Sequence, residues 1–216
     1  MESMYQQIKT LQKVVTRKRN STALTFSMPH VLKSILYLYN QKYVSRASFC
    51  QELKIGEGAV RTLISHLKEL GLVESIKAGT FLTSKGKKLA EKFHTAMPSQ
   101  TFLKKCCLTN GKYNYVILLK GEHVDDIGNG MQQRDFAILY GASDSLTLIF
   151  RDGEFVFSGD QMRCFADEIK IRDNLIESLE PENEDIVIIT SSDDKFVAEI
   201  SAINTAIGTL ATHEKH

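Results

Sequence analysis

Apolar residues recur with helical spacing on both sides of a short glycine-containing turn. Before the turn, Ser45 is suited to cap a short helix whose Phe49 and Leu53 face inward. After the turn at residues 55–58, apolar side chains occupy positions i, i+3, i+4, i+7 and i+10, namely Val60, Leu63, Ile64, Leu67 and Leu70. The pattern over residues 45–70 therefore predicts two helices joined by a tight turn.

A β-hairpin and a basic helix are predicted directly after this helix pair. Strand-like runs occupy residues 72–76 and 80–83, and Lys77-Ala78-Gly79 between them suits a hairpin turn. Residues 84–93 form a basic helical pattern, and an apolar pattern that begins after Pro29 predicts one helix ahead of the pair. Helix, helix, turn, helix, hairpin and helix is the element order of a winged helix-turn-helix domain, which we expect over residues 25–97.

The first 24 residues make a basic, amphipathic segment of their own. Met4, Ile8, Leu11 and Val15 follow a heptad-like spacing, and Arg17-Lys18-Arg19 comes after them. We expect either a helix, which pairs with its twin in a dimer or packs on its own domain, or a solvated arm. The basic cluster is suited to contact a DNA backbone.

The hydrophobic rhythm changes beyond Met97-Pro98-Ser99-Gln100, where proline and small polar residues predict a linker. Strands are predicted at residues 113–119, 146–150, 154–157 and 185–189, and helices within residues 126–140, 161–179 and 193–210. The continuous apolar run at 185–189 is typical of a central strand buried on both faces. We therefore expect a small α/β sandwich with a mixed sheet over residues 98–216, which makes the chain α+β or α/β overall.

Composition places the chain among globular proteins and predicts a cytoplasmic location. Hydrophobic residues make up 43% of the chain and charged residues 25%. The apolar runs are too short to span a bilayer, and no apolar N-terminal stretch of the secretory type is present. The cysteines show no CxxC pair, which predicts free thiols. Adjacent Cys106 and Cys107 are interpreted as buried neighbours in a strand, with a redox or metal sensor as the alternative.

Charge divides the chain at the predicted linker. Through Pro98 there are sixteen Lys and Arg residues against six Asp and Glu, a balance of +10. The remainder has eleven basic against twenty acidic residues, a balance of −9. A basic domain followed by an acidic one is typical of a DNA-binding module joined to a regulatory module.

The second helix of the central pair offers a polar face opposite its apolar stripe. Gly58, Thr62, Ser65 and Glu69 lie on that face, which suits base edges in a major groove. Cationic side chains on the neighbouring elements suit phosphates. We expect double-stranded DNA to be contacted by Ser45, Arg46, Gly58, Arg61, Thr62, Ser65, His66, Lys77, Thr80, Lys85, Lys87 and Lys88. The alternative is an ordinary helical hairpin in a core.

Two places in the acidic half are candidates for a small ligand. Glycines ahead of a helix at residues 128–130 expose backbone N–H groups to an anion, and Arg134 supplies a guanidinium. The second place is the end of the apolar strand near residue 190. The candidate residues are Gly130, Gln133, Arg134, Asp135, Thr190, Ser191 and Ser192. Alternatively, these side chains pair with neighbours or cap a helix.

Several motifs resemble known winged-helix proteins. Residues 82–89 (LTSKGKKL) resemble the start of the closing helix in many bacterial and archaeal winged-helix regulators, and residues 68–73 (KELGLV) resemble their helix-to-wing junction. Residues 56–63 and 133–142 make the chain similar to an archaeal family of winged-helix proteins with a C-terminal domain of unknown function. The resemblance implies a transcription regulator and supplies no catalytic residues.

The residues favour a binding protein over an enzyme. The six histidines are scattered, and no catalytic motif, cofactor motif or metal-ligand spacing is present. We expect a sequence-specific, DNA-binding transcription regulator, homodimeric, whose acidic domain senses a small molecule or mediates dimerisation. One alternative is a winged-helix module for protein or RNA contacts in a transcription or RNA-processing complex. Another is an enzyme acting on a small phosphorylated metabolite through the C-terminal domain.

Overall fold

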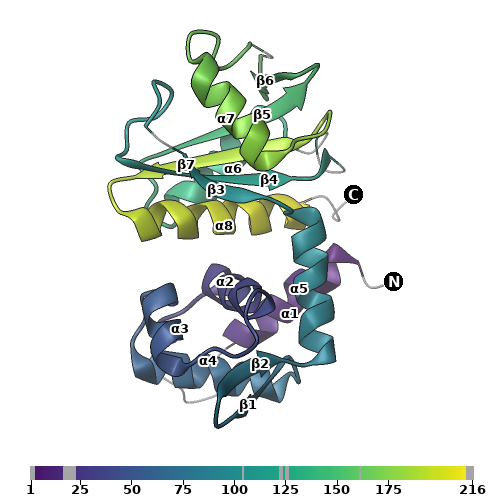
Figure 1. The fold of residues 1–216 in the computed structure, drawn as a ribbon, viewed down its shortest axis with the longest axis vertical. Coiled ribbons are helices and arrows are strands. Elements are labelled where there is room, and N and C mark those ends of the chain that lie inside the picture. The colour runs from purple at the N-terminus through teal and green to yellow at the C-terminus, as the bar shows by residue number, and fades with distance from the viewer. Residues whose placement is uncertain are drawn as a thin grey trace. The chain divides into compact units, whose positions relative to one another are not determined.

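The chain divides into two compact units, Met1–His94 and Thr95–His216 (Figure 1). The computed structural model describes residues 3–16, 23–103, 105–121, 124, 127–160 and 162–212. The predicted basic cluster at residues 17–19 lies outside these described residues.

Unit 1 consists of helices and one two-stranded hairpin. Its elements are α1 (Met4–Val15), α2 (Met28–Tyr39), α3 (Arg46–Leu53), α4 (Glu57–Glu69), β1 (Val73–Ile76), β2 (Gly79–Leu82) and α5 (Ser84–Ala96), whose last residues pass the unit boundary. Helix α1 packs against α2 and α4, and α2 also contacts α3 and β2. The core between them is filled by fully buried Phe49, Leu63, Leu67 and Phe93. The predicted helices and hairpin are all present in their predicted order.

Helix α1 buries a stripe that shares two of its four residues with the predicted one. Ile8 and Leu11 are buried as expected, but Val14 and Gln7 complete the stripe in place of Val15 and Met4. The helix therefore packs on its own unit, which is one of the alternatives that the sequence left open.

The start of α5 is anchored against the end of α4 by a glycine. A Cβ atom on Gly86 would lie 2.0 Å from the backbone oxygen of Leu72, so only glycine allows this approach. The hydroxyl of Thr83 donates to the carbonyl of Gly71 at 2.7 Å and accepts from the N–H of Gly86 at 3.1 Å. These contacts fix the hairpin β1–β2 between α4 and α5.

Unit 2 is a five-stranded sheet with helices on both faces. Its elements are β3 (Gln100–Leu103), β4 (Tyr113–Leu119), α6 (Met131–Ile138), β5 (Asp144–Arg151), β6 (Glu154–Phe157), α7 (Ile169–Leu179), β7 (Ile186–Ser192) and α8 (Lys195–Thr212). The strand order is β3-β4-β7-β5-β6. Figure 1 shows α7 on one face of the sheet and α6 and α8 on the other.

The predicted mixed sheet is wrong, because every strand pair in unit 2 is antiparallel. The apolar run predicted a central strand buried on both faces, and β7 is that strand: it is the middle strand of the sheet and all seven of its residues are buried. The predicted linker also differs, since Gln100 already begins β3 and pairs with Ile117. Short β3 alternates exposed and half-buried residues, so its apolar signal is weak.

The cysteine pair differs from its interpretation as a buried strand. Cys106 is buried and Cys107 is exposed, and both lie outside the strands. The Cys107 thiol donates to the carboxylate of Glu168 at 3.0 Å, and this hydrogen bond raises the pKa of the thiol. A protonated thiol is a poor nucleophile and metal ligand. In the described segments, no helix has the length and apolar character needed to cross a membrane.

Candidate nucleic-acid interface

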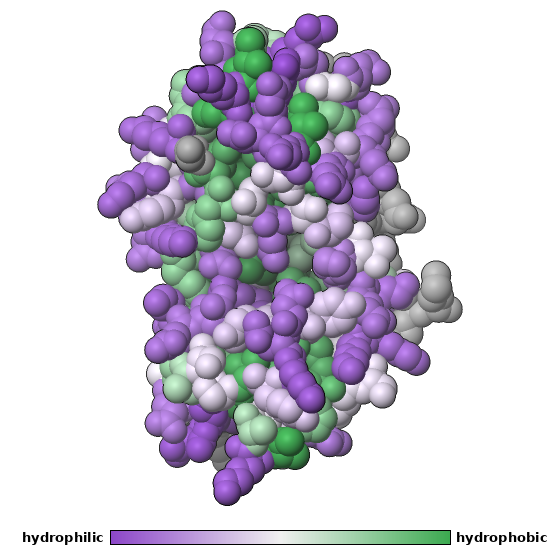
Figure 2. Space-filling view, in the orientation of Figure 1, coloured by the Kyte–Doolittle hydropathy of each residue, from purple (hydrophilic) through white to green (hydrophobic). Residues whose placement is uncertain are grey.

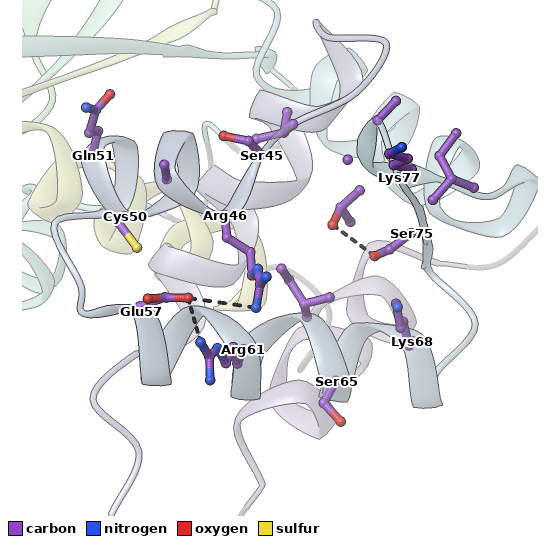
Figure 3. A pocket seen from close by; sticks show the side chains of 17 residues that line it. Ser45, Arg46, Cys50, Gln51, Glu57, Arg61, Ser65, Lys68, Ser75 and Lys77 are labelled. Carbon is purple, nitrogen blue, oxygen red and sulfur yellow. Dashed lines mark hydrogen bonds and ion pairs between the residues drawn. The ribbon is translucent and has the colours of Figure 1, made fainter.

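An open groove of about 1050 Å³ lies between α3, α4 and the hairpin β1–β2 of unit 1. Figure 3 shows Arg46 of α3 and Arg61 of α4 directed toward Glu57, with Lys68 on α4 and Lys77 in the hairpin farther along the groove. Of the residues predicted to contact DNA, the groove brings together Ser45, Arg46, Arg61, Ser65, Lys77 and Thr80. Sequence reasoning missed Lys68, Gln51 and Ser75, which also line it. The exposed cations of the groove therefore come from three elements that are separate in sequence.

Ser45 and the turn after α3 set the position of the two helices. The Ser45 hydroxyl accepts a hydrogen bond from the Ser48 N–H at 3.0 Å, which caps α3 as predicted. Lys54 ends α3 in the left-handed conformation, with φ 52°, and Gly56 is the N-cap of α4. The two helices are thereby joined by a turn of a few residues.

Glu57 places one negative charge beside the two arginines of the groove. Its Oε1 accepts a hydrogen bond from Arg61 Nη2 at 2.7 Å and lies 3.8 Å from Arg46 Nη1. The hydrogen bond and charge of Arg61 hold the pKa of Glu57 below its usual value. Because all three side chains are exposed, these ion pairs contribute little to stability, and either arginine can turn to another anion.

The exposed face of α4 carries Arg61, Ser65 and Lys68. Thr62 is half-buried and donates its hydroxyl to the Gly58 carbonyl at 3.1 Å. A Cβ on Gly58 would have no neighbour within 4 Å, so this part of the helix is open to close approach.

Two predicted contact residues are placed differently from expectation. His66 turns into unit 1, where its Nδ1 lies 2.7 Å from the carbonyl oxygen of Val14 and its ring packs edge-on against Phe26. Thr80 is only 3% exposed, and its hydroxyl lies 3.0 Å from that of Ser75. The His66 Nδ1 and the Thr80 hydroxyl are therefore engaged by partners within unit 1.

The three lysines of α5 are all exposed but have different neighbours. Lys85 donates to the carbonyl of Leu70 at 2.8 Å, which caps the end of α4. Lys87 lines a second hollow beside Tyr43 and Phe81, and Lys88 is exposed. The prediction grouped the three because they belong to one basic helical pattern, which does not show the different neighbours of each side chain.

Unit 2 has a separate hollow of about 420 Å³ at the start of α6. It brings together Gly130 and Arg134, as expected, with Ser145 and Thr147 of β5, which were missed. The other predicted residues of α6 lie elsewhere: Gln133 is fully buried and Asp135 is exposed, and neither lines the hollow. Polar residues at alternate positions of a strand were the available signal for Ser145 and Thr147.

The second predicted ligand place is occupied by contacts within the chain. The Thr190 hydroxyl donates to the carbonyl of Ala198 at 2.6 Å. Ser191 Oγ accepts from the N–H of Gly111 at 2.9 Å, and Ser192 Oγ accepts from Asp194 at 3.2 Å. These three residues are buried and hold β7 to its neighbours, so their polar atoms are not presented to a ligand.

Side chains suited to a metal do not gather in the described part of the chain. No group of three or more His, Cys, Asp or Glu residues lies close enough there to hold an ion. The visible face of the surface is mostly hydrophilic, with small separate hydrophobic patches (Figure 2).

Comparisons with known proteins match the two units separately. Residues 31–88 match the family described as PH0730-like, N-terminal domain, and residues 110–210 match a domain of unknown function, DUF4443. The structure of hypothetical protein PH0730 from Pyrococcus horikoshii OT3 is similar, with a TM-score of 0.66 and 26% identity. The similarity covers 84% of this chain and 91% of that chain. No curated protein matches. These findings indicate a two-domain family with an archaeal member and no known function.

Proposed function

Because both units are similar to an archaeal two-domain protein, we propose that this chain is a transcription regulator that binds double-stranded DNA through unit 1. In this proposal unit 1 is a winged helix-turn-helix domain, with α4 as the recognition helix and β1–β2 as the wing. Unit 2 senses a small molecule or mediates dimerisation, and both units bind rather than catalyse.

The observation that carries the proposal is the groove between α3, α4 and the hairpin. Arg46, Arg61, Lys68 and Lys77 line it from three elements, as a surface that follows a phosphate backbone requires. Helix α4 exposes short or hydrogen-bonding side chains over its outer face, and a B-DNA major groove, about 12 Å wide, admits one helix.

Charge supports the same division of labour. Residues 1–98 carry a balance of +10, and no charged residue lies between His94 and Pro98, so the same balance describes unit 1. The remaining residues carry −9 and are repelled by phosphate. We therefore assign DNA contacts to unit 1 alone.

The residues of the groove take different roles. Arg61 and Ser65 lie on the exposed face of α4 and are assigned to base edges. Arg46, Lys68 and Lys77 are assigned to phosphates, which position the domain without reading sequence. Gly58 allows close approach of the α4 backbone.

The test compares Arg61→Ala with Lys77→Ala on DNA that the full chain selects from random fragments. Arg61→Ala should weaken binding to the selected site by about 1–3 kcal/mol and reduce its preference over random DNA. Lys77→Ala should weaken binding to both DNAs alike and lower the salt slope by about one. Arg163→Ala, an exposed arginine of unit 2, is the control and should change neither. Equal losses for Arg61→Ala on selected and random DNA would remove its assignment to base edges.

A homodimer is the assembly that we propose, because helix-turn-helix regulators commonly bind two-fold symmetric sites. Light scattering of the full chain should give twice the mass of one chain. A monomer mass at high protein concentration would contradict the dimer and leave the DNA surface of unit 1 unaffected.

A further inference from the structure

Strand β5 buries two hydroxyl groups that have no hydrogen-bond partner among the described residues, those of Ser145 and Thr147. Ser145 is 7% exposed and Thr147 is 6% exposed. Buried hydroxyls in folded proteins are nearly always paired, because an unpaired one has lost its water without compensation. Two such groups, two residues apart on one strand, point to a partner that is not part of the chain.

Both hydroxyls lie under the start of α6. Ser145 pairs with Thr190 and Thr147 with Ile188 across the sheet, and the Thr190 hydroxyl reaches the carbonyl of Ala198 in α8. Ser145 and Thr147 therefore face the side of the sheet on which α6 and α8 pack. There they line the hollow of about 420 Å³ together with Arg134.

The backbone at the start of α6 lies close to β5 and to Ser158, at a glycine with positive φ. Gly130, the N-cap, has φ 78°, and a Cβ there would lie 3.0 Å from Ser158 Oγ and 3.2 Å from Thr147 Cβ. The Met131 N–H donates to the Asn129 side chain at 3.2 Å. The next two N–H groups, of Gln132 and Gln133, have no carbonyl acceptor within the helix, as in the first turn of any helix. Such a helix end attracts an anion.

The lining favours a ligand that accepts hydrogen bonds and carries negative charge. Arg134 is the basic side chain of the lining, and Ser145, Thr147 and Ser158 supply hydroxyl donors. The acidic side chain of the lining is Asp160, whose Oδ1 already accepts from the Met162 N–H at 3.0 Å. Apolar Leu146 and Phe157 complete the walls.

We infer that this hollow binds a small phosphorylated metabolite. Its phosphate accepts hydrogen bonds from the start of α6, from Arg134 and from the two buried hydroxyls of β5. A tetrahedral phosphate has more acceptor positions than a carboxylate and so matches donors that come from a helix end and a strand together. The volume also admits a small organic group beside the phosphate.

Binding of the phosphate does not depend on any role in DNA recognition. That the bound metabolite regulates unit 1 rests on the proposed function. The experiment therefore measures binding alone, so its failure is separate from a failure to bind DNA.

The experiment is a titration of the full chain with sodium phosphate, followed by amide NMR, with sodium chloride at matched ionic strength as the reference. Phosphate should give saturable shifts at the amides of Gln132, Gln133, Arg134 and Thr147, and chloride should not. Ribose 5-phosphate should bind at the same amides, and ribose without the phosphate should leave them unchanged.

Four variants separate the site from general effects of charge and stability. Arg134→Gln and Thr147→Val should each weaken phosphate binding tenfold or more. Thr147→Val should also raise the melting temperature of the free chain, because it removes an unpaired buried hydroxyl. Ser201→Ala removes another buried hydroxyl without a partner in the described segments, but one outside this hollow, and Arg163→Gln removes an exposed charge. Neither should change phosphate binding.

Three outcomes would overturn the inference. Shifts that never saturate, or that chloride reproduces, would show that the hollow holds water only. Equal affinity in Thr147→Val would remove the buried hydroxyls from the site. Saturable shifts confined to unit 1 would place phosphate on the basic groove instead.

Discussion

At the scale of single residues, Glu57 is the carboxylate that pairs with the two arginines of the unit 1 groove, which we propose to bind DNA. It binds Arg61 directly and lies near Arg46, so phosphate must displace it from both. The carboxylate also repels phosphate, while the rest of the groove attracts it. A glutamate at this position favours binding to DNA sequences at which additional contacts offset its repulsion of phosphate.

Glu57→Gln should therefore strengthen binding of the full chain to random DNA by roughly two- to fivefold, because it releases two arginines and removes one negative charge. The measurement is fluorescence anisotropy at low salt. Glu74→Gln, an exposed glutamate of β1, is the charge-matched control. If both substitutions strengthen binding equally, net charge rather than the release of the arginines is the cause.

His30 makes the stability of unit 1 depend on pH in a window of its own. Burial, with Lys33 nearby, lowers the pKa of His30 from 6.5 to about 4. Its Nδ1 accepts from the Ser27 N–H at 3.3 Å, which caps α2 and requires the neutral ring. Because the unfolded chain binds this proton more tightly, the stabilisation is complete above pH 6.5 and is lost as pH falls toward 4.

The free energy of unfolding should accordingly fall by up to about 2 kcal/mol between pH 7.5 and pH 5. His30→Gln keeps an acceptor at the third position of the helix, where glutamine is common, and cannot titrate. Urea denaturation of His30→Gln should show a much smaller fall over this range. The same fall in both proteins would assign the pH dependence to other groups.

Residue-scale function was only partly predictable from sequence. The exposed positions of Arg61 and Ser65 on α4 were predictable because helical periodicity fixes the face on which they lie. The orientations of His66 and Thr80 were not predictable, because their hydrogen-bond partners, Val14 and Ser75, become neighbours only after folding. Lys68 was missed because its distance from the hairpin is a property of the tertiary structure.

At the scale of elements, the junction between α4, the hairpin and α5 depends on Gly86. Gly86→Ala should destabilise the chain by about 1–3 kcal/mol, because the added methyl group meets the Leu72 backbone and not a movable side chain. Gly58→Ala is the matched control, since its methyl group meets nothing within 4 Å and alanine favours the helix.

Urea denaturation followed by circular dichroism measures both changes. Gly58→Ala should leave the stability unchanged or raise it by up to about 1 kcal/mol. Equal destabilisation by the two substitutions would show that the close contact between Gly86 and the Leu72 backbone is not the reason why alanine destabilises the chain at position 86.

Local sequence patterns predicted most helices and strands. The features that they did not predict, strand β3 and the antiparallel direction of the sheet, depend on pairing between segments that are distant in sequence. The hairpin at β5–β6 was found from its Asp-Gly turn, and β4 was found with its full length. The mixed sheet was wrong because a run of apolar residues such as β7 indicates burial and carries no information on the direction of the neighbouring strands. Strand β3 was missed because pairing with β4 stabilises it more than its own sequence does.

At the scale of the whole molecule, the chain joins a basic unit to an acidic one. The sequence predicted this division from charge and from proline, and the two family matches fall on opposite sides of it. An acidic second unit disfavours nonspecific binding along DNA, because it cannot lie on the duplex without repulsion. Under the proposed function, specific contacts from unit 1 would therefore have to hold the protein at its site.

The central claim is that unit 1 reads a DNA sequence. The most direct test is to bind the full chain to random genomic fragments across a series of salt concentrations and to sequence the fragments that are retained. We predict a recurring, roughly two-fold symmetric sequence whose retention persists at salt concentrations that release other fragments. Weak, salt-sensitive retention without any recurring sequence, both with and without added phosphorylated metabolites, would contradict the account.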